Sequence, residues 1–187
     1  MENTSLVALS HQAALRRQME TIAHNVANMN TTGFKAERLM FVDHLVRNPS
    51  GDQFSDPKLS FVRDVATVRD LSSGQLQHTG NPLDLAIEGD GFFVAQTPDG
   101  DRYTRNGRLR IDETGQVVTE HGMPLMTSGG QPILLGPTDT DISVSRDGTV
   151  SSENGVLGRF RVVRFDNPQT MRMVAGGLMS AEGIPQE

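Results

Sequence analysis

The first thirty residues follow a helical pattern of hydrophobic and polar positions. Apolar residues recur at spacings of four, three, four and three: Leu15, Met19, Ile22, Val26 and Met29. This is the a/d pattern of a heptad repeat, which predicts a narrow apolar stripe suited to a partner helix. Asn, Thr and Gly favour turns, so the helix is expected to end between Asn28 and Gly33. A lone helix of this length is marginal in water and must pack, either on a partner or on its own domain.

Residues 34–60 carry a weaker pattern. Apolar residues at 34, 39–41 and 45–46 are compatible with a short second helix. The stretch that follows contains Asn48-Pro49-Ser50-Gly51-Asp52 and Ser55-Asp56-Pro57, which is typical of a linker.

From Phe61 onwards short apolar runs alternate with turn residues, roughly every eight to twelve positions, without a helical pattern between them. Asn106-Gly107 is the strongest hairpin signal, because both residue types accept the backbone of a tight turn. Strands are expected at 61–68, 83–87, 92–95, 102–105, 108–111, 116–119, 133–135, 142–144, 149–151 and 159–165. The predicted fold is mainly β with an N-terminal α-helix: a helix over 1–33, a linker or short helix over 34–60, and a barrel-like or meander β domain over 61–187.

Composition narrows the function classes. The chain has 17 basic and 23 acidic residues, and its net charge of −6 argues against binding nucleic acid or anionic membranes. It contains no Cys, which excludes disulfides, Cys-ligated metals and thiol catalysis. No apolar run approaches the roughly 20 residues of a membrane span.

Residues for catalysis or ligand binding form no recognisable motif. The five His are scattered without metal-ligand spacing, and Gly89-Asp90-Gly91 lacks the third Gly and the helix of a dinucleotide site, which favours a β-turn. We therefore predict no cofactor, no metal and no enzyme activity. A carbohydrate-active enzyme or a binding module built on the β domain remains the alternative class, because paired catalytic carboxylates leave no local trace.

The stretch Ile22–Lys35 resembles the amino-terminal signature of the bacterial flagellar rod and hook proteins, Ala-Asn-Asn-Leu-Ala-Asn followed by Thr and Gly-Phe-Lys. His24 replaces the first Asn of the signature and Val26 its Leu. Residues 74–93 and 103–107 are similar to two further family blocks, so the resemblance covers most of residues 15–120. The matching signature residues that we single out are Asn25, Asn28, Thr31, Gly33, Phe34 and Lys35.

The resemblance implies a structural subunit of the flagellar basal body, closest to proximal-rod members and next to distal-rod members. The implied partners are other rod subunits, further copies of the chain, and the flagellar type III export apparatus that delivers members to the periplasmic rod. Relatives place their N-terminal and C-terminal helices in an inner coiled-coil layer, with a β-rich domain outside it. The expected C-terminal helix is absent from this sequence, which ends at Glu187.

Roles for individual residues follow from the same resemblance. The stripe Leu15, Met19, Ile22, Val26 and Met29 is the expected assembly interface. Asn25 and Asn28 are expected to cap or cross-link backbone groups, or simply to end the helix. Gly33 would allow a turn and Phe34 would anchor the next segment. Phe41 and Leu45 fit the spacing of an export motif, although an amphipathic turn explains them equally well.

Overall fold

The computed structural model describes residues 2–47, 58–139 and 141–186, with side chains at 5, 8–40, 66–139 and 141–186. The chain forms two compact units. The first unit comprises Met1–Asn30 and Lys35–Leu71, and the second comprises Thr31–Phe34 and Ser72–Glu187.

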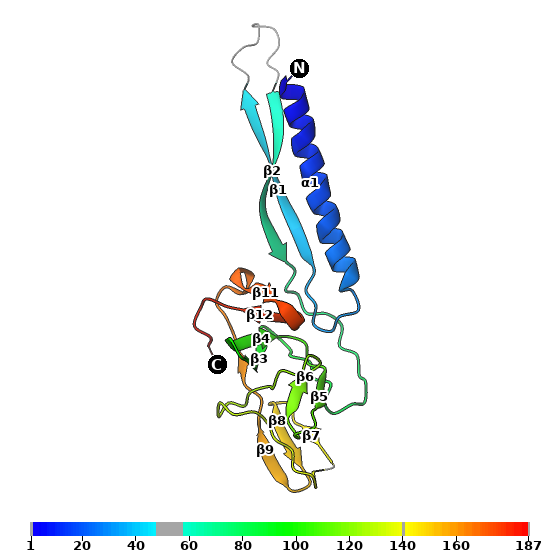
Figure 1. Cartoon of the computed structure of the whole chain (residues 1–187), viewed down its shortest axis with the longest axis vertical. Helices are drawn as coiled ribbons and strands as arrows, with labels where there is room; N and C mark the ends of the chain where they lie inside the picture. Colours follow the sequence, from blue (N-terminus) through cyan, green and yellow to red (C-terminus); the bar gives the residue numbers. More distant parts are fainter. Residues whose placement is uncertain (1, 48–57, 140, 187) are drawn as a thin grey trace. The chain divides into compact units, whose positions relative to one another are not determined.

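The first unit contains one helix and one long antiparallel strand pair. Helix α1 (Glu2–Ala27) runs alongside strands β1 (Glu37–Arg47) and β2 (Lys58–Arg69) (Figure 1). The strand register extends from Glu37 opposite Arg69 to Arg47 opposite Lys58, with one bulge beside Met40. The helix ends where its turn-forming residues begin, so the expected end of the helix is confirmed.

The short second helix expected within 34–60 is wrong, because this stretch forms β1. Its apolar run is too short for periodicity to separate helix from strand, and its Phe and Val residues favour a strand. Pairing with β2 decides the matter. The predicted boundary between residues 60 and 61 falls inside β2, which begins at Lys58.

The second unit is built from three small antiparallel sheets. The largest has the order β10-β3-β4-β12-β11, and its strands are β3 (Phe92–Thr97), β4 (Gly100–Thr104), β10 (Val162–Val163), β11 (Arg172–Val174) and β12 (Leu178–Ser180). Strands β5 (Leu109–Ile111) and β6 (Val117–Thr119) form the second sheet. Strands β7 (Ser143–Val144), β8 (Thr149–Ser152) and β9 (Gly155–Arg159) form the third. Two 3-10 turns, Pro168–Thr170 and Ala175–Gly177, flank β11. The predicted fold class, mainly β with an N-terminal helix, is confirmed.

Strand β3 is the centre of this unit because both of its faces are buried. Phe93 and Ala95 point into one hydrophobic cluster, whereas Phe92 and Val94 point into another. This is the alternation that a strand imposes on its side chains. The ring of Phe93 meets Phe160 edge to face at 5.8 Å, and the ring of Phe92 meets Phe165 at 6.0 Å. A continuous apolar run therefore supplies both cores.

Two of the expected strands do not form. Residues 83–87 and 133–135 contribute only isolated bridges, through Asp84 and Leu134. Their apolar residues Leu83, Ile133 and Leu135 are nevertheless buried in the core. The expected run 159–165 forms only the short strand β10 beyond the end of β9. The hydrophobic pattern therefore identified core positions correctly, but it predicted strands where only isolated bridges form.

The hairpin expected at Asn106-Gly107 is also wrong, since β4 and β5 lie in different sheets. Asn106 accepts a hydrogen bond from the Arg108 N–H (3.0 Å), which makes a local polar turn. Gly107 accepts a hydrogen bond from the Leu85 N–H (2.8 Å), and a Cβ at position 107 would overlap the Leu85 carbonyl. This glycine permits a close approach of two backbones rather than a hairpin turn.

Candidate assembly surface

The apolar stripe of α1 faces water. Its members Leu15, Met19, Ile22, Val26 and Met29 are between 53% and 71% exposed. The first four lie on one side of α1, and Met29 follows just beyond its end. In an ordinary surface helix such a stripe would face the core of its own domain. Here it is open to a partner.

The side of α1 that packs on the β1–β2 hairpin is made of small and polar residues. Among the side chains of α1 that the structure describes, the half-buried or buried ones are Ser10, Ala14, Thr21, His24 and Asn25. At 3.6 residues per turn their centre lies roughly 130° around the helix from the apolar stripe. Helix α1 contacts both strands of the hairpin. It therefore packs on β1 and β2 with its small and polar side rather than with its stripe.

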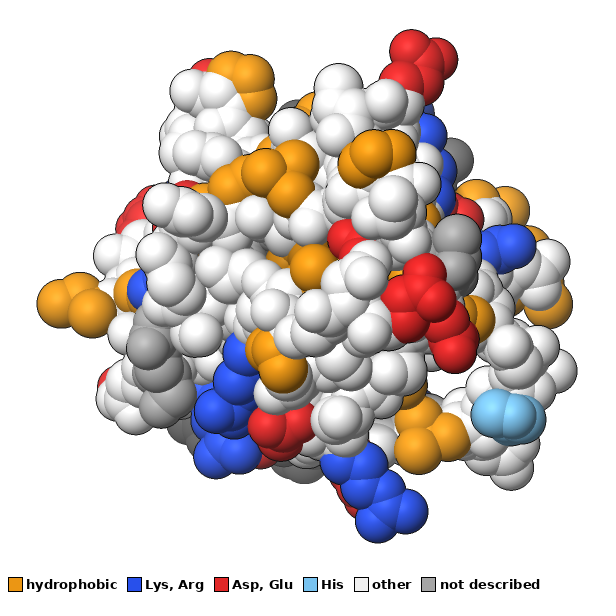
Figure 2. Space-filling view, turned by 90° about the horizontal axis from the view of Figure 1, so that it is seen from below, with side chains coloured by type: hydrophobic (Ala, Val, Ile, Leu, Met, Phe, Trp, Pro, Cys, Tyr) orange, Lys and Arg blue, Asp and Glu red, His pale blue; other side chains and the backbone are white. Residues whose placement is uncertain are grey.

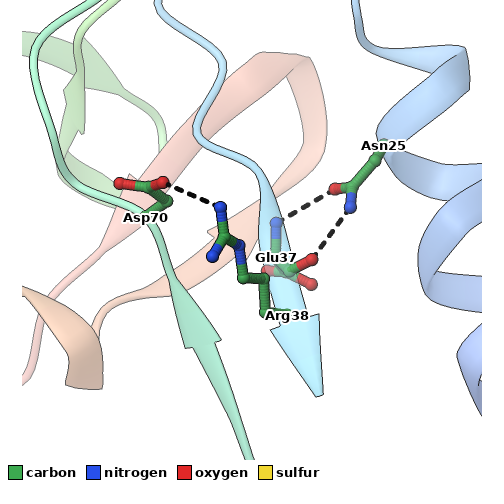
Figure 3. A network of polar contacts seen from close by, with 4 residues as sticks. All are labelled: Asn25, Glu37, Arg38 and Asp70. Atoms are coloured by element: carbon green, nitrogen blue, oxygen red, sulfur yellow. Dashed lines mark hydrogen bonds and ion pairs between the residues drawn. The ribbon is translucent and has the colours of Figure 1, made fainter.

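Asn25 joins the end of α1 to the start of β1 (Figure 3). Its Nδ2 donates to the Glu37 carbonyl at 2.8 Å, and its Oδ1 accepts from the Glu37 N–H at 3.0 Å. One side-chain amide thus satisfies both backbone groups of one strand residue. The expected cross-linking role corresponds to this geometry, whereas Asn28 donates to the His24 carbonyl (2.9 Å) within the helix end.

Ion pairs surround this link. The Glu37 carboxylate contacts Arg69 Nε at 3.0 Å, and both side chains are largely buried. Arg38 lies 3.5 Å from Asp70 on the surface (Figure 3), where a pair contributes little. The Asp70 N–H donates to the Ala36 carbonyl at 2.8 Å. No local sequence signal marks the Glu37–Arg69 pair, because 32 positions separate the residues and neither belongs to a motif.

A hollow of about 250 Å³ lies between α1 and β1. Ile22 of the apolar stripe and Asn25 both contribute to its wall, so the hollow adjoins the stripe. Its lining residues are Gln18, Thr21, Ile22, Asn25, Glu37, Arg38 and Leu39.

The remaining signature residues occupy a turn in the second unit, apart from half-buried Lys35, which belongs to the first. The Phe34 N–H donates to the Thr31 carbonyl at 3.2 Å, and half-buried Phe34 follows Gly33. Gly33 has a φ of +73°, and a Cβ there would come within 2.7 Å of the Arg105 carbonyl. The expected turn at Gly33 thus has a second requirement, the close approach to Arg105.

Arg105 is a further residue that sequence analysis did not single out, although it stands in one of the family blocks. Its guanidinium lies 4.8 Å above the Phe92 ring and 3.8 Å from Asp90. Burial lowers the pKa of Arg105, and Asp90 acts in the opposite direction. Three blocks of the sequence, around residues 33, 90 and 105, therefore meet at this point.

The two residues of the expected export motif lie in β1. Phe41 pairs with Asp64 and Leu45 pairs with Ser60, so the segment is a strand rather than an amphipathic turn. Their side chains lie outside the described residues, and the motif stays a prediction.

A carbohydrate-active enzyme would need paired carboxylates in a cleft, and neither of two hollows formed by described residues holds such a pair. One hollow, of about 240 Å³, includes Asp147 and Arg159, and the Asp147 carboxylate is already bound by Thr149 at 2.8 Å. In the other, Glu37 is held by Arg69. On the face seen in Figure 2, hydrophobic side chains form small groups between polar and charged ones.

The described residues contain no group of three His, Cys, Asp or Glu side chains placed to hold a metal ion. Within the same residues, no helix has the length and hydrophobicity needed to cross a bilayer.

Two protein-family models match the chain. The flagella basal body rod protein model covers residues 6–35, and the model of the flagellar hook protein FlgE/F/G D1 domain covers residues 86–152. The flagellar basal-body rod protein FlgF of Caulobacter vibrioides is 39% identical over 170 residues, which are 91% of this chain and 69% of the relative. The chain belongs to the flagellar basal-body rod proteins.

Other members of the family show the same order of similarity. FlgF of Rhizobium meliloti is 38% identical over 181 residues, with 91% of this chain and 72% of the relative covered. The rod protein FlgG of Bacillus subtilis is 31% identical over 187 residues, with 91% and 70% covered. The predicted likeness to the rod proteins named FlgF, with FlgG next, is confirmed, as is the prediction of a structural rod subunit of the flagellar basal body.

Proposed function

We propose that the chain is a subunit of the proximal rod and assembles through the apolar stripe of α1. The observation that carries this proposal is that Leu15, Met19, Ile22 and Val26 are more than half exposed, on a side of α1 that lies roughly 130° around the helix from its contact with the hairpin. Burial of apolar surface contributes about 25 cal/mol per Å², so covering these side chains favours association. The fitting partner is a helix with a matching heptad stripe, on another rod subunit or a further copy of this chain.

This arrangement suits a rod that transmits torque. Interlocked side chains resist shear between helices through many small packing contacts. The role requires no catalysis, and we propose that the chain is not an enzyme. Similarity to FlgG relatives supports distal-rod subunits as neighbours. We also propose delivery by the flagellar type III apparatus to the periplasmic rod, with the spacing of Phe41 and Leu45 in its support.

The test is a single charge in the stripe. Ile22→Asp would place a carboxylate in the expected helix–helix contact, which should block rod assembly and motility in cells lacking the parent protein. Ala13→Asp adds the same charge at an exposed position of α1 outside the stripe and should leave motility unchanged. Circular dichroism should show an intact β domain in both variants. Normal motility with Ile22→Asp would contradict the proposal.

A further inference from the structure

The amide of Asn25 occupies the backbone N–H and C=O of Glu37 at the start of β1. It donates to the Glu37 carbonyl and accepts from the Glu37 N–H, at 2.8 and 3.0 Å. The two bonds close a ring with a single strand residue, much as the paired bonds between two opposed residues of an antiparallel ladder do. Asn25 and Glu37 are both half-buried, and 12 positions separate them in the sequence. The contact therefore links two elements rather than finishing one helix.

This link bears on which side of α1 faces the hairpin. The hydrophobic effect is non-directional and would favour turning the apolar stripe onto the strands. A hydrogen bond is directional, and a pair of them at one residue accepts little rotation. Asn25 lies on the contact side of α1 with Ala14 and Thr21, at the border between that side and the stripe.

We propose that Asn25 is a positioning residue, whose amide fixes the rotation of α1 on the β1–β2 hairpin and so keeps the apolar stripe available to a partner. The use of the stripe in assembly rests on the proposed function. The rotational role does not.

The strand side of the link is held independently. The Glu37 carboxylate contacts Arg69 on β2, which ties the acceptor residue to both strands of the hairpin. The Asp70 N–H donates to the Ala36 carbonyl next to it. Asn25 thus contacts a backbone segment fixed from the opposite side, so the amide can transmit a defined orientation to α1.

The chemistry of the link is specific to asparagine. Aspartate at this position could accept from the Glu37 N–H, but its second oxygen would face the Glu37 carbonyl, where Nδ2 now donates at 2.8 Å. Alanine would remove both bonds. Asn28 provides a matched control, because its Nδ2 donates to the His24 carbonyl one turn back in the same helix end.

The absence of cysteine in the chain makes a direct measurement practical. Spin labels attached to Ala23→Cys on α1 and Ala66→Cys on β2, both exposed, report the helix–hairpin distance by pulsed electron paramagnetic resonance in dilute solution. We expect one narrow distribution in the labelled parent and in Asn28→Ala. Asn25→Ala and Asn25→Asp should broaden and shift it.

Amide exchange gives a second measurement of the same link. Loss of two hydrogen bonds should make exchange of the Glu37 N–H roughly 10- to 30-fold faster in Asn25→Ala. Asn28→Ala should leave it within about threefold of the parent. An unchanged distance distribution in Asn25→Ala would overturn the proposal. So would melting of α1 in that variant, because Asn25 would then stabilise the helix itself rather than its orientation.

The assembly assay separates this inference from the proposed function. If Ile22→Asp blocks assembly, Asn25→Ala should also reduce it. Normal assembly with a broadened distribution would overturn the link between orientation and assembly. If Ile22→Asp has no effect, the proposed function fails, and the distance measurement alone decides whether Asn25 orients α1.

Discussion

Gly33 is the position where a single methyl group tests the turn of the family signature. Its φ of +73° lies in the left-handed region, and a Cβ would stand 2.7 Å from the carbonyl carbon and oxygen of Arg105. Gly33→Ala therefore has two costs: roughly 1–2 kcal/mol for the backbone conformation and about 1–3 kcal/mol for forcing a packed backbone apart. Gly130 isolates the first cost, since its φ is +75° and nothing lies within 4 Å of its would-be Cβ.

The assay uses the single tyrosine of the chain. Tyr103 is buried in the second unit, and the chain has no Trp, so tyrosine fluorescence during urea unfolding reports that unit. We expect Gly130→Ala to lower the free energy of unfolding by roughly 1–2 kcal/mol and Gly33→Ala by about 2–5 kcal/mol. If the turn of residues 31–34 instead separates from Arg105 in Gly33→Ala, amide exchange of the Phe34 N–H should become at least about tenfold faster. Equal losses in the two variants, with unchanged Phe34 exchange, would refute the packing argument.

Two further expectations concern the second unit. The pKa values of Asp112, Asp139 and Asp147 are lowered, chiefly by hydrogen bonds from Thr114, Asn154 and Thr149 respectively. A lowered folded-state pKa stabilises the fold above the unfolded pKa, near 3.9, and this stability is lost as pH falls through the folded pKa. The urea concentration at the unfolding midpoint should therefore decrease below about pH 4. The decrease should be smaller in Asp147→Asn, which lacks one of the three carboxylates. Phe160 is 3% exposed and contacts Phe93, so Phe160→Ala should cost about 3–5 kcal/mol in the same fluorescence assay; a loss below about 1 kcal/mol would contradict its place in the core.

The sequence pattern located features whose causes are local. Turn chemistry at Asn28 and Gly33 ended α1, and the heptad spacing identified the residues that remain exposed on it. The short apolar runs separated by turn residues beyond residue 61 were enough to predict a mainly β fold class. Buried runs such as 92–95 were recognised because a strand covered on both faces is apolar throughout.

What the sequence could not supply depends on partners distant along the chain. Strand β1 forms because β2 pairs with it across a gap in sequence, and its own short apolar run does not exclude a helix. A glycine is required at position 107 because the Leu85 backbone lies too close for any Cβ. The sequence around an Asn-Gly pair cannot reveal such a distant neighbour. The link between Asn25 and Glu37 was foreseen only as a type of contact, since its acceptor becomes known with the geometry.

The residues that flank the apolar stripe of α1 limit the means by which it could select a partner helix. With Leu15, Ile22 and Met29 at d and Met19 and Val26 at a, the flanking e and g positions are Arg16, Gln18, Ala23 and Asn25. Arg16 alone among these is charged, and it already contacts Glu20 at 3.3 Å. Interhelical ion pairs usually select the partner of a coiled coil, and this stripe has too few charged flanking residues to form many of them. Because apolar contact itself is non-directional, selection would depend on the heptad spacing and on the orientation of α1. That orientation is the property we assign to Asn25, a g-position residue that faces the hairpin on one side and borders the stripe on the other.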